Sequence, residues 1–139
     1  MSDIGDIAPD FTSETDQGAG ISLSSLRGKK VVLYFYPKDN TPGCTREACD
    51  FRDSLPAFTA KGVVVLGVST DSVKSHLNFK VKFDLPFTLV ADPKKDIVAK
   101  YGVFVEKQNY GHTYMGVART TFLIDETGTI EKIYNKVRV

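Results

Sequence analysis

Four short apolar runs divide this chain of 139 residues into regular segments. They are VVLYFY at 31–36, VVVLGVS at 63–69, LPFTLVAD at 85–92 and TTFLID at 120–125. Runs of this length are typical of β-strands that are covered on both faces. After the fourth run, Glu126, Thr127 and Gly128 predict a turn, from which TIEKIYNKV returns as an alternating strand. The pattern therefore predicts a buried sheet that is closed by an antiparallel hairpin.

Helical patterns lie between these runs, at 41–58, at 72–83 and, more briefly, at 96–101. Nearer the start, FTSETDQGAGISLSSL predicts a small N-terminal hairpin, because its Asp and Gly residues supply turn chemistry. Buried strands that alternate with helices predict an α/β fold. We expect a thioredoxin-like sandwich, with a central mixed β-sheet flanked by helices, over a single domain at 1–139. Periodicity alone is compatible with other α/β folds.

Composition and charge exclude several classes of partner. The formal net charge is +1 and no long run of one sign occurs, so neither nucleic acid nor an anionic membrane surface is expected to bind. The start, MSDIGDIAPDFTSETD, is acidic and interrupted, unlike a signal peptide, and the apolar runs are too short to span a bilayer. We expect a cytoplasmic protein, whose two cysteines are reactive or inert thiols rather than a structural crosslink.

Both cysteines lie in PKDNTPGCTREACDF at 37–51. Thr41 is a good helix N-cap, Pro42 suits the first helical position and Gly43 lets a ligand approach the backbone. Cys44 then falls in the first turn, where unpaired N–H groups and the positive end of the helix dipole favour a thiolate. Cys44 is therefore the candidate nucleophile.

Cys49 lies on a different face of the same predicted helix. At about 100° per residue, Cys44 shares an apolar stripe with Ala48, Phe51 and Leu55. The charged residues face elsewhere: Arg46, Glu47, Asp50 and Asp53. Helix geometry separates the two cysteine Cα atoms by roughly 8 to 9 Å, beyond disulfide reach, which ends near 7 Å. A bond between the two sulfurs would thus require the first turns to unwind, which would couple reactivity to local unfolding.

Each candidate also has a simpler interpretation. The cysteines could be buried apolar residues, or zinc ligands with His76 and His112, although neither histidine stands beside a second ligand. His76 is predicted to be a surface or capping residue and His112 to lie in a loop; neither is assigned a role. Thr41 could be an N-cap only, Pro37 could simply end a strand, and an Arg near a buried strand is often paired with a carboxylate.

The segment PKDNTPGCTREACDFRD resembles the active-site segment of peroxiredoxins of the bacterioferritin comigratory protein, or peroxiredoxin Q, type. Pro37, Thr41 and Cys44 match the general family motif, and Cys49 matches the second cysteine of this subfamily. Downstream, GVARTTFLIDETGTI resembles a second signature, in which Arg119 opens a strand beside the reactive cysteine. The similarity extends to APDFT, VVLYFYPKD, GVSTDS, LPFTLVAD and YGV, and so covers nearly the whole chain.

The resemblance implies a thiol peroxidase without metal or other cofactor. Cys44 would attack a hydroperoxide and become a sulfenic acid, and Cys49 would resolve it to an intramolecular disulfide that thioredoxin or a similar dithiol protein reduces. Arg119 would stabilise the anionic sulfur and the charge that develops on the peroxide oxygens. The Thr41 hydroxyl would accept a hydrogen bond from the peroxide and donate one to the thiolate, and Pro37 would shield the sulfur from water.

The family also implies a monomer, and it usually continues into a further helix after the last strand, whereas this chain stops at NKVRV. We expect that a missing helix would leave apolar surface on one layer. Two other functions stay open at this stage. One is a general dithiol–disulfide oxidoreductase, which the C-x4-C spacing disfavours. The other is a redox sensor or binding module switched by the same disulfide.

Overall fold

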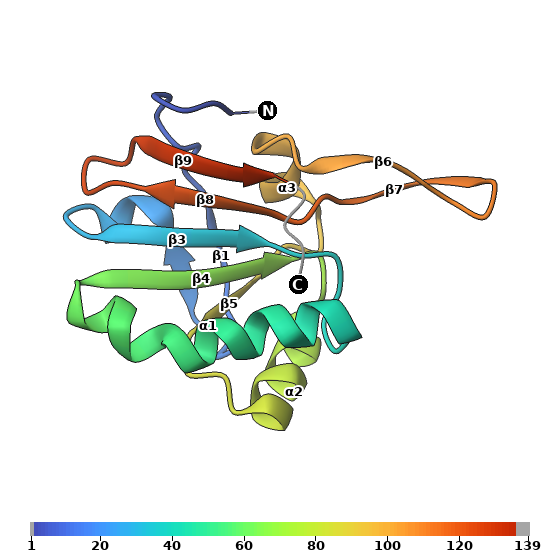
Figure 1. Cartoon of the computed structure of the whole chain (residues 1–139), viewed down its shortest axis with the longest axis horizontal. Coiled ribbons are helices and arrows are strands. Elements are labelled where there is room, and N and C mark those ends of the chain that lie inside the picture. Colours follow the sequence, from blue (N-terminus) through green and yellow to red (C-terminus); the bar gives the residue numbers. More distant parts are fainter. Residues whose placement is uncertain (1, 136–139) are drawn as a thin grey trace.

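The computed structural model describes residues 2–135 and contains a five-stranded mixed sheet (Figure 1). Its strands stand in the order β5-β4-β3-β8-β9. Their bounds are β3 Lys30–Phe35, β4 Val63–Ser69, β5 Thr88–Ala91, β8 Thr120–Ile124 and β9 Ile130–Asn135. The first three run parallel, whereas β8 is antiparallel to β3, and β9 to β8. The predicted mixed sheet is confirmed, although the third apolar run becomes a strand only at Thr88, and the last two residues of TIEKIYNKV lie outside the described residues.

Two apolar layers cover the two faces of the sheet, and β3 contributes to both because its side chains alternate. Val31, Leu33 and Phe35 belong to one cluster, which the short helix α3 (Asp96–Lys100) and the N-terminal segment help to build. Val32 and Tyr34 belong to the other, beneath α1 (Pro42–Ala60) and α2 (Val73–Phe83). Figure 1 shows α1 running alongside β4, roughly parallel to the strands, with α2 beside it. Within residues 2–135, none of the helices has the length and hydropathy needed to cross a bilayer.

Two hairpins extend this sandwich. The predicted N-terminal one is present as β1 (Thr12–Glu14) and β2 (Gly20–Ser22), followed by a 3-10 turn at Leu23–Leu26. A second hairpin, β6 (Phe104–Asn109) with β7 (His112–Val117), was not predicted and projects from the body in Figure 1. Its two-residue turn has positive φ at Tyr110 (51°) and Gly111 (79°), as a type I′ turn requires. His112 was predicted to lie in a loop, and this was wrong, because it lies in strand β7.

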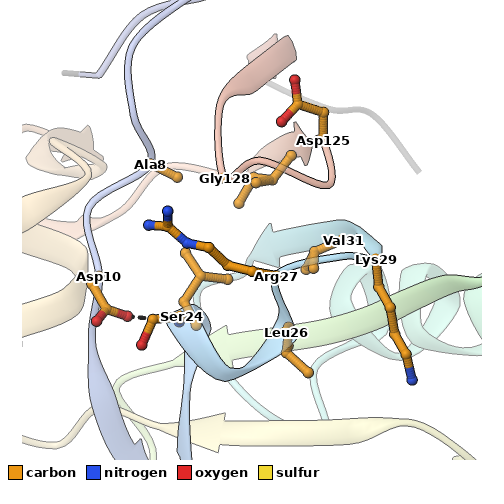
Figure 2. Close-up of a pocket in the computed structure, with 11 residues that line it drawn as sticks. Ala8, Asp10, Ser24, Leu26, Arg27, Lys29, Val31, Asp125 and Gly128 are labelled. Carbon is orange, nitrogen blue, oxygen red and sulfur yellow. Dashed lines mark hydrogen bonds between the residues drawn. The ribbon is translucent and has the colours of Figure 1, made fainter.

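A small hollow lies at the start of β3, between the N-terminal segment, the 3-10 turn and the β8–β9 turn (Figure 2). Asp10 accepts a hydrogen bond from the Ser24 backbone N–H at 2.9 Å, and the Arg27 side chain extends toward Gly128. The hollow holds about 10 Å³, room for a single water molecule. The cysteine segment follows the opposite end of β3, so this hollow is not part of its surroundings.

Gly67 of β4 is the position where a close approach excludes any side chain. A Cβ there would lie 2.8 Å from the ring of Tyr34, its buried partner on β3. We expect Gly67→Ala to lower the free energy of unfolding by about 1–3 kcal/mol, because a full core cannot shift to admit a methyl group. Gly20→Ala is the matched control, since its Cβ would meet nothing closer than the Ser13 carbonyl oxygen at 3.9 Å. Urea unfolding of both variants tests this, and equal destabilisation would contradict it.

Candidate active site

The loop that follows β3 leads directly into α1. Thr41 has extended backbone angles (φ −99°, ψ 156°) at the N-cap position, and Pro42 begins the helix, as predicted. The Thr41 hydroxyl makes no capping bond and donates its one hydrogen to the Lys38 carbonyl at 2.9 Å, so the expected donation to the Cys44 sulfur is not made. Its oxygen keeps lone pairs to accept a further hydrogen bond. Pro37 is partly buried at the start of this loop.

Cys44 lies in the first turn of α1 and is only 2% exposed. Arg119 Nη2 donates to its Sγ at 3.2 Å. The sheet register explains the meeting of residues 75 positions apart, because Phe35 at the end of β3 pairs with Thr120 at the start of β8. Arg119, one residue before β8, is therefore held beside the loop that leads to Cys44. The sulfur thus lies at the positive end of the helix dipole and accepts from a guanidinium, and both favour negative charge on it.

Glu47 completes this group, and the prediction that it faces away from Cys44 was wrong. It is 3% exposed, and its Oε1 accepts from Arg119 Nη1 at 2.8 Å. Residues three apart on a helix are neighbours on one face, so Glu47 lies one turn behind the sulfur. Arg119 therefore bridges Cys44 and Glu47 through its two terminal nitrogens, which fixes the plane of the guanidinium.

Burial and neighbouring charges shift the pKa of both Glu47 and Arg119. Burial raises the pKa of Glu47, and the hydrogen-bonded charge of Arg119 only partly opposes this rise. For Arg119, burial lowers the pKa, but the hydrogen bond to Cys44 and the charges of Cys44 and Glu47 outweigh it and raise the pKa overall. The guanidinium is thus always charged in the site.

A second cation, Lys107 of β6, approaches from the unpredicted hairpin. A Cβ at Gly116 would lie 3.2 Å from its Cδ and 3.3 Å from the Tyr114 ring, so the lysine stem lies across Gly116. Partial burial lowers the pKa of Lys107, the charge of Arg119 lowers it further, and the charge of Cys44 acts in the opposite direction. Lys107 is therefore within the electrostatic field of the site. Its sequence position gave no signal, because the hairpin that brings it there was not predicted.

Cys49 lies farther along α1, partly buried, and both cysteines are free thiols. The predicted apolar stripe is present, since Ala48 is buried and Phe51 and Leu55 pack against the same cluster as Cys44. Because α1 is continuous over both cysteines, a disulfide between them would need the helix to unwind, as the sequence predicts.

His76 was predicted at the surface or as a cap, and this was wrong. It is 0% exposed, and its Nδ1 lies 2.7 Å from Oδ2 of Asp39, in the loop before α1. Ser72 is the residue that caps α2, by accepting from the Ser75 backbone N–H at 3.1 Å. His112 is exposed in β7.

A family model and curated relatives both match nearly the whole chain. The AhpC/TSA family model matches residues 4–133. A putative peroxiredoxin bcp of Coxiella burnetii is 55% identical over 137 residues, which cover 99% of this chain and 91% of that protein. Peroxiredoxin Bcp of Bacillus subtilis is 48% identical, with 99% and 87% covered.

Solved structures show the same likeness. The bacterioferritin comigratory protein of Xanthomonas campestris, studied for its alkyl peroxide reduction activity, is 40% identical with a TM-score of 0.89. The similarity covers 93% of this chain and 82% of that one. A mutant of Xylella fastidiosa PrxQ is 37% identical with a TM-score of 0.94, and here 100% and 89% are covered.

Proposed function

This chain belongs to the AhpC/TSA family, and from that premise we propose that it is a thiol peroxidase whose nucleophile is Cys44. The observation that carries the assignment is the 3.2 Å hydrogen bond from Arg119 to Cys44 Sγ at the start of a helix. A buried cysteine with no role would be expected among apolar groups, not opposite a guanidinium that is itself held by Glu47. This arrangement activates a sulfur for nucleophilic attack.

The first step consumes one hydroperoxide. The substrates include alkyl peroxides, whose reduction was studied in the Xanthomonas campestris relative. The Cys44 thiolate attacks the terminal oxygen, so an S–O bond forms as the O–O bond breaks. The departing oxygen takes the electron pair and a proton and leaves as water or alcohol, while Cys44 becomes a sulfenic acid. Arg119 is placed to stabilise the charge on the oxygens during this transfer. Thr41 offers the peroxide an acceptor, and Pro37 limits the access of water.

The second step forms the disulfide. The Cys49 thiolate attacks the sulfenic sulfur of Cys44, the S–S bond forms and hydroxide leaves, taking a proton to become water. Since both residues lie in one helix, the first turns of α1 unwind for this step. A dithiol protein such as thioredoxin then reduces the disulfide by exchange and restores both thiols. We propose that the protein acts as a cytoplasmic monomer over a single domain at 1–139.

The test is the rate at which the reduced protein loses its thiols after one equivalent of hydrogen peroxide at neutral pH, compared with free cysteine. We expect both thiols to disappear together, many orders of magnitude faster than in free cysteine. A rate near that of free cysteine would refute the peroxidase and favour a redox sensor switched by the same disulfide. Insulin reduction without any dependence on peroxide would instead identify a general dithiol–disulfide oxidoreductase.

Cys49→Ser separates the two steps. We expect this variant to consume one equivalent of peroxide at close to the unmodified rate, because the donor to Cys44 Sγ is Arg119, which the substitution leaves in place. It should then stop with a sulfenic acid on Cys44, which a dimedone adduct measured by mass spectrometry would identify. Wild-type protein, treated in parallel, should yield the disulfide and no adduct. Continued turnover of the variant with thioredoxin and its reductase would show that Cys49 is not required for resolution.

A further inference from the structure

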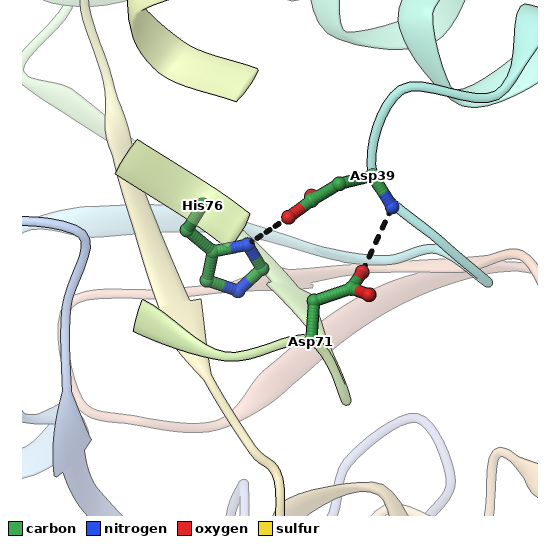
Figure 3. Close-up of side chains that lie close together, drawn as sticks. All are labelled: Asp39, Asp71 and His76. Atoms are coloured by element: carbon green, nitrogen blue, oxygen red, sulfur yellow. Dashed lines mark hydrogen bonds and ion pairs between the residues drawn. The ribbon is translucent and has the colours of Figure 1, made fainter. Parts of the chain in front are cut away.

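A buried polar network lies beside the loop that precedes α1. At its centre is Asp39, which is 7% exposed. Figure 3 shows its carboxylate directed at His76 and its backbone nitrogen at Asp71. Tyr36 donates to its Oδ1 at 2.5 Å, Ser75 donates to its Oδ2 at 2.8 Å, and His76 Nδ1 lies 2.7 Å from the same Oδ2. The Asp39 backbone N–H donates to Oδ2 of Asp71 at 2.8 Å. We call these five residues the Asp39 network.

The hydrogen bonds of His76 determine where its hydrogens lie. Its Nε2 is 3.0 Å from the carbonyl oxygen of Val90, which can only accept, so Nε2 carries a hydrogen. Its Nδ1 faces Asp39 at 2.7 Å, and two lone pairs do not meet at that distance, so a second hydrogen lies between them. Both ring nitrogens are thus engaged. This leaves no ring nitrogen for a metal ion, although Asp39, Asp71 and His76 have ligand atoms within 4.8 Å of one another.

The network, together with the hydrogen bond from His76 to Val90, joins three elements to the loop. His76 and Ser75 belong to α2, Val90 belongs to β5, and Tyr36 directly follows β3. Immediately beyond Asp39 the backbone turns, because Asn40 adopts a left-handed conformation (φ 57°). The position of Asp39 therefore fixes the starting point of residues 40–43, which lead to Cys44.

We propose that His76 is a positioning residue for the peroxide reaction, acting through Asp39. This inference rests on the proposed function. With Asp39 fixed, the loop holds Cys44 within hydrogen-bond reach of Arg119. The five residues that follow Asp39, at 40–44, can span roughly 17 Å when extended, so the first turn of α1 can unwind while the network stays closed. The network therefore serves the peroxide step, and disulfide formation does not depend on it.

Two substitutions separate the two hydrogen bonds of His76. In His76→Asn the side-chain amide takes the place of Nδ1 and keeps a donor toward Asp39. In His76→Gln the longer amide reaches the place of Nε2 and keeps a donor toward Val90. We expect His76→Gln to lower the rate constant for peroxide at least about tenfold, and His76→Asn to stay within about threefold of wild type. The rate constant would be measured by competition with horseradish peroxidase for hydrogen peroxide.

Disulfide formation provides the internal control. Acid quenching, alkylation and mass spectrometry would follow the sulfenic acid as it converts to disulfide, and we expect this rate to stay within about twofold of wild type in both variants. Equal slowing of the peroxide step in both variants, in proportion to their loss of unfolding free energy, would show a purely structural role. No slowing in His76→Gln would also overturn the inference.

A second readout needs no peroxidase activity. Amide hydrogen exchange in residues 40–45 should be faster in His76→Gln than in His76→Asn, because only the first loses the donor to Asp39. Equal exchange in the two variants would refute the role of His76 but would leave the proposed peroxidase function standing. Wild-type protein that reacts with peroxide no faster than free cysteine would refute the proposed function, whatever the exchange shows.

Discussion

Cys44→Ser is expected to abolish hydroperoxide consumption while leaving the fold intact. The substitution replaces the sulfur with a smaller oxygen at a position that is 2% exposed, and Arg119 can donate to the hydroxyl as it does to Sγ. Serine offers no thiolate and no sulfur atom that the peroxide can oxidise. The S–O bond that begins the cycle therefore cannot form. The loss should exceed about 10³-fold, down to the background rate of peroxide decay.

Consumption of hydrogen peroxide and of an alkyl hydroperoxide would be measured with the ferrous–xylenol orange assay. Cys49→Ser is the matched control, since it removes the other thiol of the same helix and keeps the first turnover. Circular dichroism and urea unfolding would establish that Cys44→Ser is folded. Consumption by Cys44→Ser at the rate of Cys49→Ser would assign the chemistry to another group and overturn the proposed mechanism.

The sequence predicts the sheet well, because the burial of a strand is a local property of its residues. The runs at 31–36 and 63–69 are apolar on both faces, and both lie between the two apolar layers. The β6–β7 hairpin escaped prediction for the converse reason. Its outer part is polar and exposed, and Tyr110 occupies a turn position where Asn or Asp would have given a clear signal.

The candidate site was predictable where its chemistry is local and not where distant residues complete it. Thr41, Pro42 and Cys44 form one helix start, and the family resemblance added Arg119. Glu47 reads as a surface carboxylate until Arg119, 72 residues later, is placed beside it. His76 reads as a surface residue for the same reason, because its partner Asp39 lies 37 positions earlier. The burial of Glu47 and of His76 depends on a partner that is distant in the sequence, and the spacing of residues along a helix gives no information about such a partner.

Arg119→Met is expected to slow the peroxide reaction by about 10²–10³-fold, the usual cost of removing one donor aimed at developing charge. The side chain is 17% exposed and its two terminal nitrogens reach Cys44 at 3.2 Å and Glu47 at 2.8 Å. Methionine keeps the apolar stem but offers no donor and no charge. The thiolate then loses its stabilising cation, and the peroxide oxygens lose the group placed to receive their negative charge.

This substitution also leaves Glu47 buried without its partner, which should cost about 1–3 kcal/mol of unfolding free energy. The double variant Arg119→Met/Glu47→Gln separates the two effects, because it removes the unpaired carboxylate as well. We expect the double variant to recover stability but not the peroxide rate constant. Arg119→Lys keeps one charge but cannot bridge both partners with fixed geometry, so its rate constant should fall between wild type and Arg119→Met. Recovery of the rate in the double variant would mean that Arg119 acts by neutralising Glu47 rather than on the sulfur and the peroxide.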